Sequence, residues 1–297
     1  MTQICPQCQG FVVGCPVCNA PPKRRELSGK ERVKRMIAAS QFMSNPEAPA
    51  YAVNGIDISG WNGTMNIAIA KQKAQYGFIR LGYGDCWEDK RADENRQKAL
   101  DNDWPYGGYW YCWPGYDWKT TAESFAEVLD RFPYQLDVVI DIEQTMLGRD
   151  ATLEWAIALD EYLQSLTGRT PIIYTAKYFW DEKVARSSHF SNRKNWVANW
   201  TLGYAPYTPL DMPDWGHWQW SADGNNMGAQ YGAGPDGDAD MDLNRFKGTA
   251  QEFDALYGTH IEYPDEPPVE PPVVITPIKY VYVTAGSLNM RSAPGDL

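Results

Sequence analysis

The chain has 297 residues, 43% of them hydrophobic and 22% charged, so it can hold one large globular domain with small appendages or two ordinary domains. Its formal net charge of -11 argues against a nucleic-acid partner, because such partners need a basic surface that neutralises phosphates. The sequence contains no run of 18 apolar residues, so we expect no membrane-spanning helix.

Residues 1–22 contain two C-P-x-C motifs, separated by six residues. The first residues lack the basic and apolar regions of a secretory signal, so we expect synthesis in the cytoplasm, where thiols stay reduced. Four thiolates in a short reduced segment favour a structural zinc site. Two redox-active pairs or an unstructured tail are alternatives, since zinc ribbons usually space their pairs more widely. The expected metal ligands are Cys5, Cys8, Cys15 and Cys18.

A second segment, residues 23–50, begins with a basic, helix-prone stretch and continues into a polar passage with two prolines. It is expected to be a helical tether. From residue 51 to residue 258 short apolar runs alternate with amphipathic stretches, a pattern that predicts a parallel sheet covered by helices on both faces. The expected strands are residues 53–58, 78–83, 107–112, 138–142, 172–175, 196–200 and 217–221.

Helical periodicity fills the stretches between these strands, and the fold class is therefore α/β. The pattern Thr120-Thr121-Ala122-Glu123 resembles a capping box at the start of the third helix. About seven strands in this length fit a closed β/α barrel of the TIM type better than an open doubly wound sheet, which spacing alone does not exclude. The expected helices are residues 66–74, 92–102, 121–131, 153–166 and 178–186.

Residues 259–278 form a proline-rich, acidic stretch that is typical of an extended linker. The remaining segment, residues 279–297, is too short to bury a core of its own. Its sequence G-S-L-N-M-R-S-A-P-G resembles the beginning of a bacterial SH3-like wall-binding domain.

Acidic residues gather where the expected strands end, and in a barrel the chemistry lies at these ends. Asp141 and Glu143 close the apolar run at 138–142, and their spacing along a strand points both side chains to the same face, with Cα atoms about 6.5 Å apart. Two like charges this close raise one pKa, and an apolar wall raises it further, so Glu143 is expected to stay protonated as a general acid. Asp57, Asp240 and Asp242 lie near other strand ends.

The motif G-I-D-I-S-G-W at 55–61, the strand ending D-I-E at 141–143 and the closing D-L-N-R-F at 242–246 resemble glycoside hydrolase family 25, the muramidases of phage endolysins and bacterial lysozymes. The resemblance covers about residues 51–258. It implies a modified β/α barrel, an N-acetylmuramidase that cleaves peptidoglycan, and no catalytic cofactor. It also implies that Glu143 is the general acid, Asp141 its partner, and Asp57 and Asp242 supporting carboxylates, with Asp240 in reserve.

Two mechanisms are compatible with such a pair of acids. In the first, which we prefer, Asp141 orients the 2-acetamido group of the substrate as an internal nucleophile while Glu143 protonates the leaving oxygen. In the second, a water held between more distant acids inverts the anomeric centre.

The 13 tryptophans and 18 tyrosines exceed what a core of this size needs, and flat rings with polar edges commonly stack on sugars. Core packing is the alternative for any single ring. The rings expected to contact substrate are Tyr83, Tyr111, Tyr174, Trp200 and Trp220.

The expected enzyme is a monomer whose partner is bacterial peptidoglycan. A barrel that binds glycan without cleaving it, in a phage particle or a wall-anchoring protein, is the main alternative, since a fold can outlast its chemistry. A chitinase-like hydrolase is a third candidate, but the longer acidic series of those enzymes is missing before Asp141.

Overall fold

A computed structural model of the chain describes residues 53–200, 205–222 and 226–261. The expected zinc segment, tether, linker and SH3-like segment lie outside these residues, and so do the four expected cysteine ligands. Within the described residues, no helix combines the length and the apolar character needed to cross a membrane.

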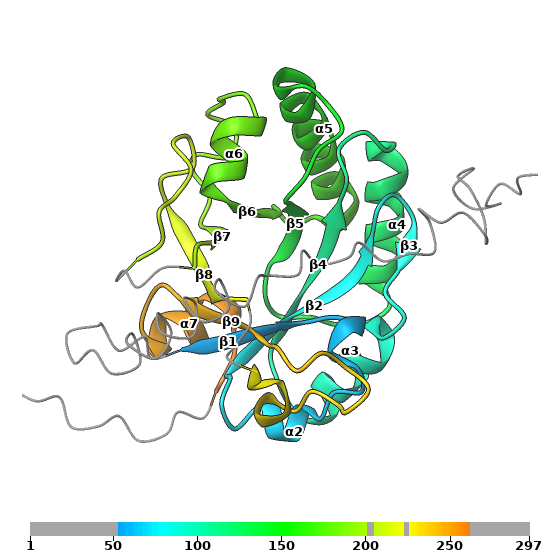
Figure 1. Cartoon of the computed structure of the whole chain (residues 1–297), viewed down its shortest axis with the longest axis vertical. Coiled ribbons are helices and arrows are strands. Elements are labelled where there is room, and N and C mark those ends of the chain that lie inside the picture. Colours follow the sequence, from blue (N-terminus) through cyan, green and yellow to red (C-terminus); the bar gives the residue numbers. More distant parts are fainter. Residues whose placement is uncertain (1–52, 201–204, 223–225, 262–297) are drawn as a thin grey trace, which may run out of the picture. The chain divides into compact units, whose positions relative to one another are not determined.

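The described strands form one sheet that closes on itself (Figure 1). The order is β1-β9-β8-β7-β6-β5-β4-β2-β3, and an additional pairing of β1 with β2 completes a barrel, with β3 at its rim. The strands are β1 (Asn54–Ile58), β2 (Tyr76–Tyr83), β3 (Trp87–Glu88), β4 (Tyr106–Cys112), β5 (Val138–Ile142), β6 (Ile172–Ala176), β7 (Asn195–Ala198), β8 (Trp215–Ser221) and β9 (Asp242–Phe246).

The expected β/α barrel is confirmed, but the expectation of a wholly parallel sheet is wrong. β9 runs antiparallel to both of its neighbours, β1 and β8, and β3 runs antiparallel to β2. All other strand pairs are parallel. The sequence did not indicate β9 as a strand because three of its five residues are charged or amide side chains, and two of these point into the barrel.

Helices cover the outside of the barrel, and Figure 1 shows α3, α4 and α5 along the side formed by β2, β4 and β5. The five expected helices are present, although α2 is shorter than predicted. The sequence analysis did not predict α7. The helices are α2 (Ile67–Ala70), α3 (Ala92–Asp101), α4 (Trp118–Asp130), α5 (Arg149–Thr167), α6 (Lys177–Lys183) and α7 (Ala250–Tyr257), with short 3-10 turns η1 (Gly60–Asn62) and η3 (Gly228–Tyr231).

Alternation along each strand separates two apolar cores. On β2, Ile79 and Leu81 face outward into the layer beneath the helices. Tyr76 and Phe78 face inward and pack with rings from β4, β6 and β7. Arg80 is the next inward residue after Phe78, so a charged side chain follows where the inner apolar layers end. The polar part of the interior therefore lies toward the carboxyl ends of the parallel strands.

Candidate active site

Asp57 is buried at the carboxyl end of β1 and is held by two amide side chains. Its Oδ2 accepts hydrogen bonds from Gln219 Nε2 and Asn244 Nδ2, both at 2.9 Å. The amide oxygens are engaged elsewhere: Tyr174 donates to Gln219 Oε1 at 2.8 Å, and Trp196 donates to Asn244 Oδ1 at 2.9 Å. Because each amide oxygen already accepts a hydrogen bond, the amide orientation is fixed and the NH₂ groups are directed at the carboxylate.

Two further expected acids lie at the same end of the barrel. Asp242 begins β9 and stands opposite Asp57 in the antiparallel register, so the two Cα atoms are direct neighbours. Asp141 lies on β5, opposite Tyr111 on one side and Tyr174 on the other. Asp141 is only 3% exposed, and its Oδ1 is buried without a hydrogen-bond partner.

The electrostatic environment of Asp141 favours its neutral form. Burial raises the pKa of Asp141 well above its usual range, and the charges of Glu143 and Asp57 raise it further. Arg80 acts in the opposite direction, by attraction. Burial and neighbouring negative charge therefore both favour the neutral form of Asp141.

Glu143 follows β5 directly and is exposed. Its charge raises the pKa values of Asp141, Tyr111 and Tyr174, which places its carboxylate among these side chains. The raised pKa expected at Glu143 stays a prediction. The pKa of its neighbour Asp141, which lies inside the strand, is raised by burial. The structure thus brings all four expected acids to one end of the barrel and divides the pair into a buried member and an exposed member.

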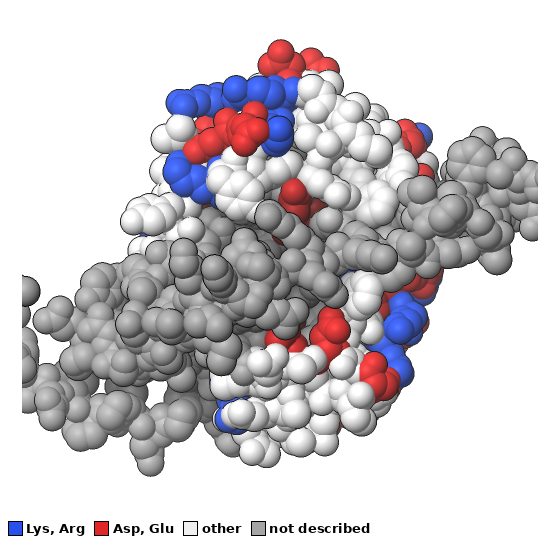
Figure 2. Space-filling view, in the orientation of Figure 1, with Lys and Arg blue, Asp and Glu red and all other residues white. Residues whose placement is uncertain are grey.

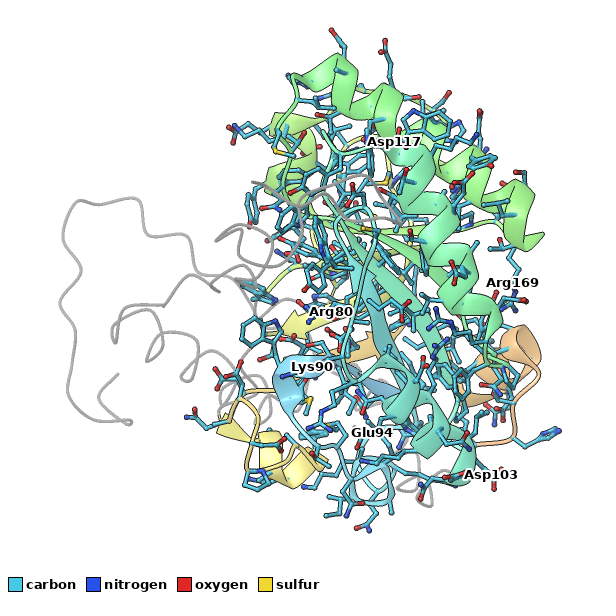
Figure 3. The ribbon with its side chains drawn as sticks, turned by 90° about the vertical axis from the view of Figure 1, so that its right-hand side faces the viewer. Arg80, Lys90, Glu94, Asp103, Asp117 and Arg169 are labelled. Carbon is cyan, nitrogen blue, oxygen red and sulfur yellow. The ribbon has the colours of Figure 1, made fainter. Side chains whose placement is uncertain are left out.

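Arg80 lies among these acids and was not identified from the sequence. On β2 it stands opposite Tyr109 of β4, and it forms an ion pair with Asp89 at 2.7 Å. Figure 3 shows Arg80 and Arg169 on opposite sides of the ribbon. A cation within the apolar run Phe78–Tyr83 was the available signal in the sequence.

The five aromatic residues expected to contact substrate occupy different environments. Tyr83 and Tyr111 are half-buried at the ends of β2 and β4, and Trp200 is 41% exposed beyond β7. Tyr174 is buried, and Trp200 and Tyr174 both donate to Gln219 Oε1, at 3.2 and 2.8 Å. Tyr174 therefore supports the amide that holds Asp57.

Trp220 lies on β8 at a register shift in the pairing with β9, and the guanidinium carbon of Arg245 lies 4.5 Å from its ring centroid. The reserve acid, Asp240, is half-buried and precedes β9 rather than lying on it.

Three further rings extend the aromatic surface beside Tyr83 and Tyr111. Trp87 stacks on Tyr83 with ring centroids 6.1 Å apart, and it contacts Tyr116 edge-on at 5.8 Å. Trp113 stacks on Tyr116 at 5.4 Å and contacts Tyr111 at 6.0 Å. These five half-buried rings form a continuous band around the ends of β2 and β4.

This end of the barrel combines carboxyl groups with aromatic rings, which is an arrangement that can bind a sugar and protonate its glycosidic oxygen. On the face shown in Figure 2, charged residues gather over α6 and beside α3, and most other described atoms are uncharged, with several acidic side chains among them. Within the described part of the chain, no group of three or more histidine, cysteine or acidic residues is arranged to hold a metal ion.

Comparison with known proteins gives consistent matches. The sequence profile of glycosyl hydrolases family 25 matches residues 56–229, a segment that includes Asp57, Asp141 and Glu143 and ends before Asp242. Lysozyme M1 of Streptomyces globisporus is 27% identical over 222 residues, which cover 70% of this chain and 72% of that protein.

Solved structures agree with this match. The bacterial lysozyme of Streptomyces coelicolor is 26% identical with a TM-score of 0.61, covering 70% of this chain and 98% of that chain. A family 25 glycosyl hydrolase of Bacillus anthracis, 21% identical, shares the fold with a TM-score of 0.59, covering 70% of this chain and 95% of that chain.

Proposed function

The chain belongs to glycosyl hydrolases family 25, and from this we propose that it is an N-acetylmuramidase, which cleaves the β-1,4 bond between N-acetylmuramic acid and N-acetylglucosamine in peptidoglycan. The observation that carries the proposal is the cluster of Asp57, Asp141, Glu143 and Asp242 at one end of the barrel. The similarity to lysozyme M1 supports the choice of substrate.

We assign the general acid to Glu143, because it is the exposed member of the pair and can reach a bound sugar. In the first step the carbonyl oxygen of the substrate's 2-acetamido group attacks the anomeric carbon. The bond to the glycosidic oxygen breaks, its electron pair stays on that oxygen, and Glu143 supplies the proton. In the second step the Glu143 carboxylate takes a proton from water, and this water opens the cyclic intermediate.

Asp141 orients the 2-acetamido group during these steps, and its buried position suits this role. A side chain fixed inside a strand keeps one geometry, so the nucleophilic carbonyl is held ready for attack. Asp57 and Asp242 are the supporting carboxylates, and Gln219 and Asn244 fix Asp57.

The aromatic residues Tyr83, Tyr111 and Trp200 provide sugar-stacking surfaces in this proposal, since all three are partly exposed near strand ends. Tyr174 acts through Gln219 instead. Trp220 remains a candidate from the sequence alone.

Muropeptide analysis of digested cell wall tests the proposed reaction. The wild-type chain should release fragments that end in reducing muramic acid, and Glu143→Gln should lower kcat by about 10²- to 10⁴-fold while wall binding persists. Glu161→Gln, at an exposed position on α5, is the matched control and should retain full activity. Binding without any released reducing ends in the wild type would support the alternative of a non-catalytic glycan-binding barrel. Products from chitin but not from wall would support a chitinase.

The stereochemistry of the first product tests the mechanism separately. Assistance by the acetamido group retains the β configuration, whereas direct attack by water inverts it. Proton NMR during the first minutes of hydrolysis distinguishes the two, and an α-configured first product would exclude the acetamido mechanism.

We also propose a structural zinc ion on Cys5, Cys8, Cys15 and Cys18, which metal analysis of the purified full chain would test. Release from the producing cell by lysis, as for a phage endolysin, is our working hypothesis. Active protein outside intact, non-lysing cells would contradict it. Sedimentation analysis would test the expected monomer.

A further inference from the structure

Arg80 is a cation placed among acids at the site, and the roles proposed above do not use it. Its position on β2 is level with Tyr109 of β4, and Asp141 lies one strand further along, level with Tyr111. The positive charge of Arg80 opposes the burial-raised pKa values of Asp141, Tyr109 and Tyr111, so its guanidinium lies near these three side chains.

Asp89 holds this guanidinium in one orientation. Its Oδ2 accepts hydrogen bonds from Arg80 Nε at 2.7 Å and from the backbone N–H of Gly60 at 2.9 Å, and it forms an ion pair with Arg80 Nη2 at 2.7 Å. Its Oδ1 accepts from the backbone N–H of Arg91 at 2.9 Å. The Asp89 side chain is 1% exposed, so it is fixed by the end of β1, by β2 and by the segment that leads into α3. Arg80 therefore loses little further side-chain entropy when it binds a ligand.

One end of the Arg80 guanidinium is available to a ligand. Nε and Nη2 are engaged by Asp89, whereas the hydrogen bonds among the described residues include none from Nη1. The side chain is 13% exposed, which is enough for a donor to reach a molecule bound in the site. A guanidinium with a free edge favours carbonyl and carboxylate oxygens.

The chemistry of the substrate indicates which oxygen this donor would meet. In the proposed reaction the acetamido group on carbon 2 of the muramic acid lies at Asp141. The neighbouring carbon 3 carries an O-lactyl group in muramic acid and only a hydroxyl in N-acetylglucosamine. The guanidinium that faces Asp141 is therefore next to the substituent that distinguishes the two sugars.

We propose that Arg80, positioned by Asp89, binds an acyl oxygen of the 3-O-lactyl substituent and makes the site selective for muramic acid over N-acetylglucosamine. The inference rests on the proposed function and adds its sugar specificity. The acyl oxygen belongs to a free carboxylate in glycan without peptides and to an amide carbonyl where the stem peptide is attached.

A purely structural role is the alternative, and the chain offers a comparison for it. Arg131, at the end of α4, also pairs with a carboxylate through two nitrogens, at 2.7 and 2.8 Å to Glu88, but both partners of this pair are partly exposed. Arg131→Gln therefore removes an arginine–carboxylate pair of the same kind without removing a donor that faces Asp141.

Binding to the full chain in a Glu143→Gln background tests the inference by isothermal titration calorimetry. The ligands are a peptide-free muramic acid tetrasaccharide, its peptide-bearing form, and chitotetraose, which has no lactyl group. Arg80→Gln should weaken binding of the muramic ligands about tenfold and leave chitotetraose within about twofold. Arg80→Lys should recover part of the lost affinity for the muramic ligands. Asp89→Asn should reduce this affinity less than Arg80→Gln does, and Arg131→Gln should leave it unchanged.

The inference is overturned if Arg80→Gln binds the muramic ligands as tightly as its parent, or loses both ligand classes equally. If chitotetraose binds too weakly to measure, weaker binding of the muramic ligands by Arg80→Gln together with an unchanged Tm supports the inference. If Arg80→Gln loses more affinity for the peptide-free ligand than for the peptide-bearing one, the contact is to the carboxylate. An equal loss of affinity for both ligands assigns the contact to the acyl carbonyl. Failure of the proposed function is a separate result, because the wild-type chain would then release no muramic acid ends.

Discussion

Asp141 lies on β5 and Glu143 lies just beyond its end, and the two side chains meet different surroundings. Asp141 is inside the barrel, with an Oδ1 that no hydrogen bond satisfies, whereas Glu143 is exposed beyond the strand end. Desolvation depends on burial, so it acts on Asp141 far more than on Glu143. The two carboxyl groups of the pair therefore meet different electrostatic surroundings, although they are near neighbours along the chain.

The raised pKa of Asp141 predicts a pH-dependent effect on stability. An aspartic acid with a raised folded-state pKa stabilises the fold below its ordinary pKa of about 3.9, and this contribution is lost as pH rises through the raised value. Asp141→Asn replaces the buried titratable group by a neutral amide. The difference in free energy of unfolding between this variant and wild type should be more favourable to the variant at pH 7 than at pH 4. We expect this gain to be at least about 1 kcal/mol.

Urea unfolding at both pH values measures this difference. Asp130→Asn, an exposed position at the end of α4, serves as the control and should show no such pH dependence. An equal effect of Asp141→Asn at pH 4 and pH 7 would contradict the raised pKa.

Asn244 connects two buried groups, and its removal should affect both. It donates to Asp57 and accepts from Trp196 Nε1, so Asn244→Ala leaves a buried N–H without its acceptor and Asp57 with one amide donor fewer. We expect a loss of about 1–3 kcal/mol in the free energy of unfolding. We also expect kcat for wall hydrolysis to fall about tenfold, since positioning errors are costly in catalysis. Asn102→Ala, which removes a side-chain hydrogen bond at the end of α3, should leave kcat unchanged.

At the scale of an element, α4 shows how a local signal can mark the wrong residue. The sequence suggested a capping box from Thr120 to Glu123, but the helix begins at Trp118 and Asp117 caps it. The Asp117 carboxylate accepts from the backbone N–H of Thr120 at 2.9 Å and from its hydroxyl at 2.6 Å. Glu123 instead accepts from the hydroxyl of Tyr162 on α5.

Asp117→Ala should therefore destabilise the protein by about 1 kcal/mol, because α4 loses the acceptor for a free N–H of its first turn. These hydrogen bonds also lower the pKa of Asp117 below its ordinary value. The contribution is present above the ordinary pKa and is lost as pH falls through the lowered value. Chemical unfolding at pH 7 measures the loss, and Glu123→Gln is the comparison. A larger loss of stability in Glu123→Gln than in Asp117→Ala would instead support the capping box predicted from the sequence.

For the whole molecule, closure of the barrel depends on the pairing of β1 with β2. Gly55 on β1 lies beside Tyr76 on β2, and a Cβ at residue 55 would lie 2.3 Å from the tyrosine ring. The ring in turn contacts His217, whose Nδ1 lies 3.0 Å from the Tyr76 hydroxyl. The seam between β1 and β2 at Gly55 and Tyr76 is therefore packed from both sides and has no room for an added methyl group.

Gly55→Ala should lower the free energy of unfolding by about 1–3 kcal/mol, the usual cost of overpacking. Gly148→Ala is the matched control, because a Cβ there meets nothing within 4 Å and the residue caps α5 without a side-chain hydrogen bond. Thermal unfolding of the two variants compares them directly. Equal Tm values would show that the seam can relax and that closure does not depend on this glycine.

The sequence by itself determined the alternation of strands and helices, the barrel class and the carboxylates at strand ends. These features follow from local periodicity and from the rule that polar groups after an apolar strand lie at its end. Seven of the nine described strands were predicted, because their apolar residues are largely β-branched or aromatic and turn residues bound them. The motif residues Asp57, Asp141 and Glu143 were identified in the same way.

Only the tertiary structure decided which member of the acid pair is buried, which amides hold Asp57, and that Arg80 and Asp89 stand beside Asp141. Each of these depends on residues from strands far apart in the sequence, such as β1 with β8 and β9. Their effects arise from desolvation and charge at short range, which exist only once the barrel is closed. β9 was not predicted for a related reason. Its polar side chains are stable in a buried strand only where other strands of the closed barrel supply hydrogen-bond partners.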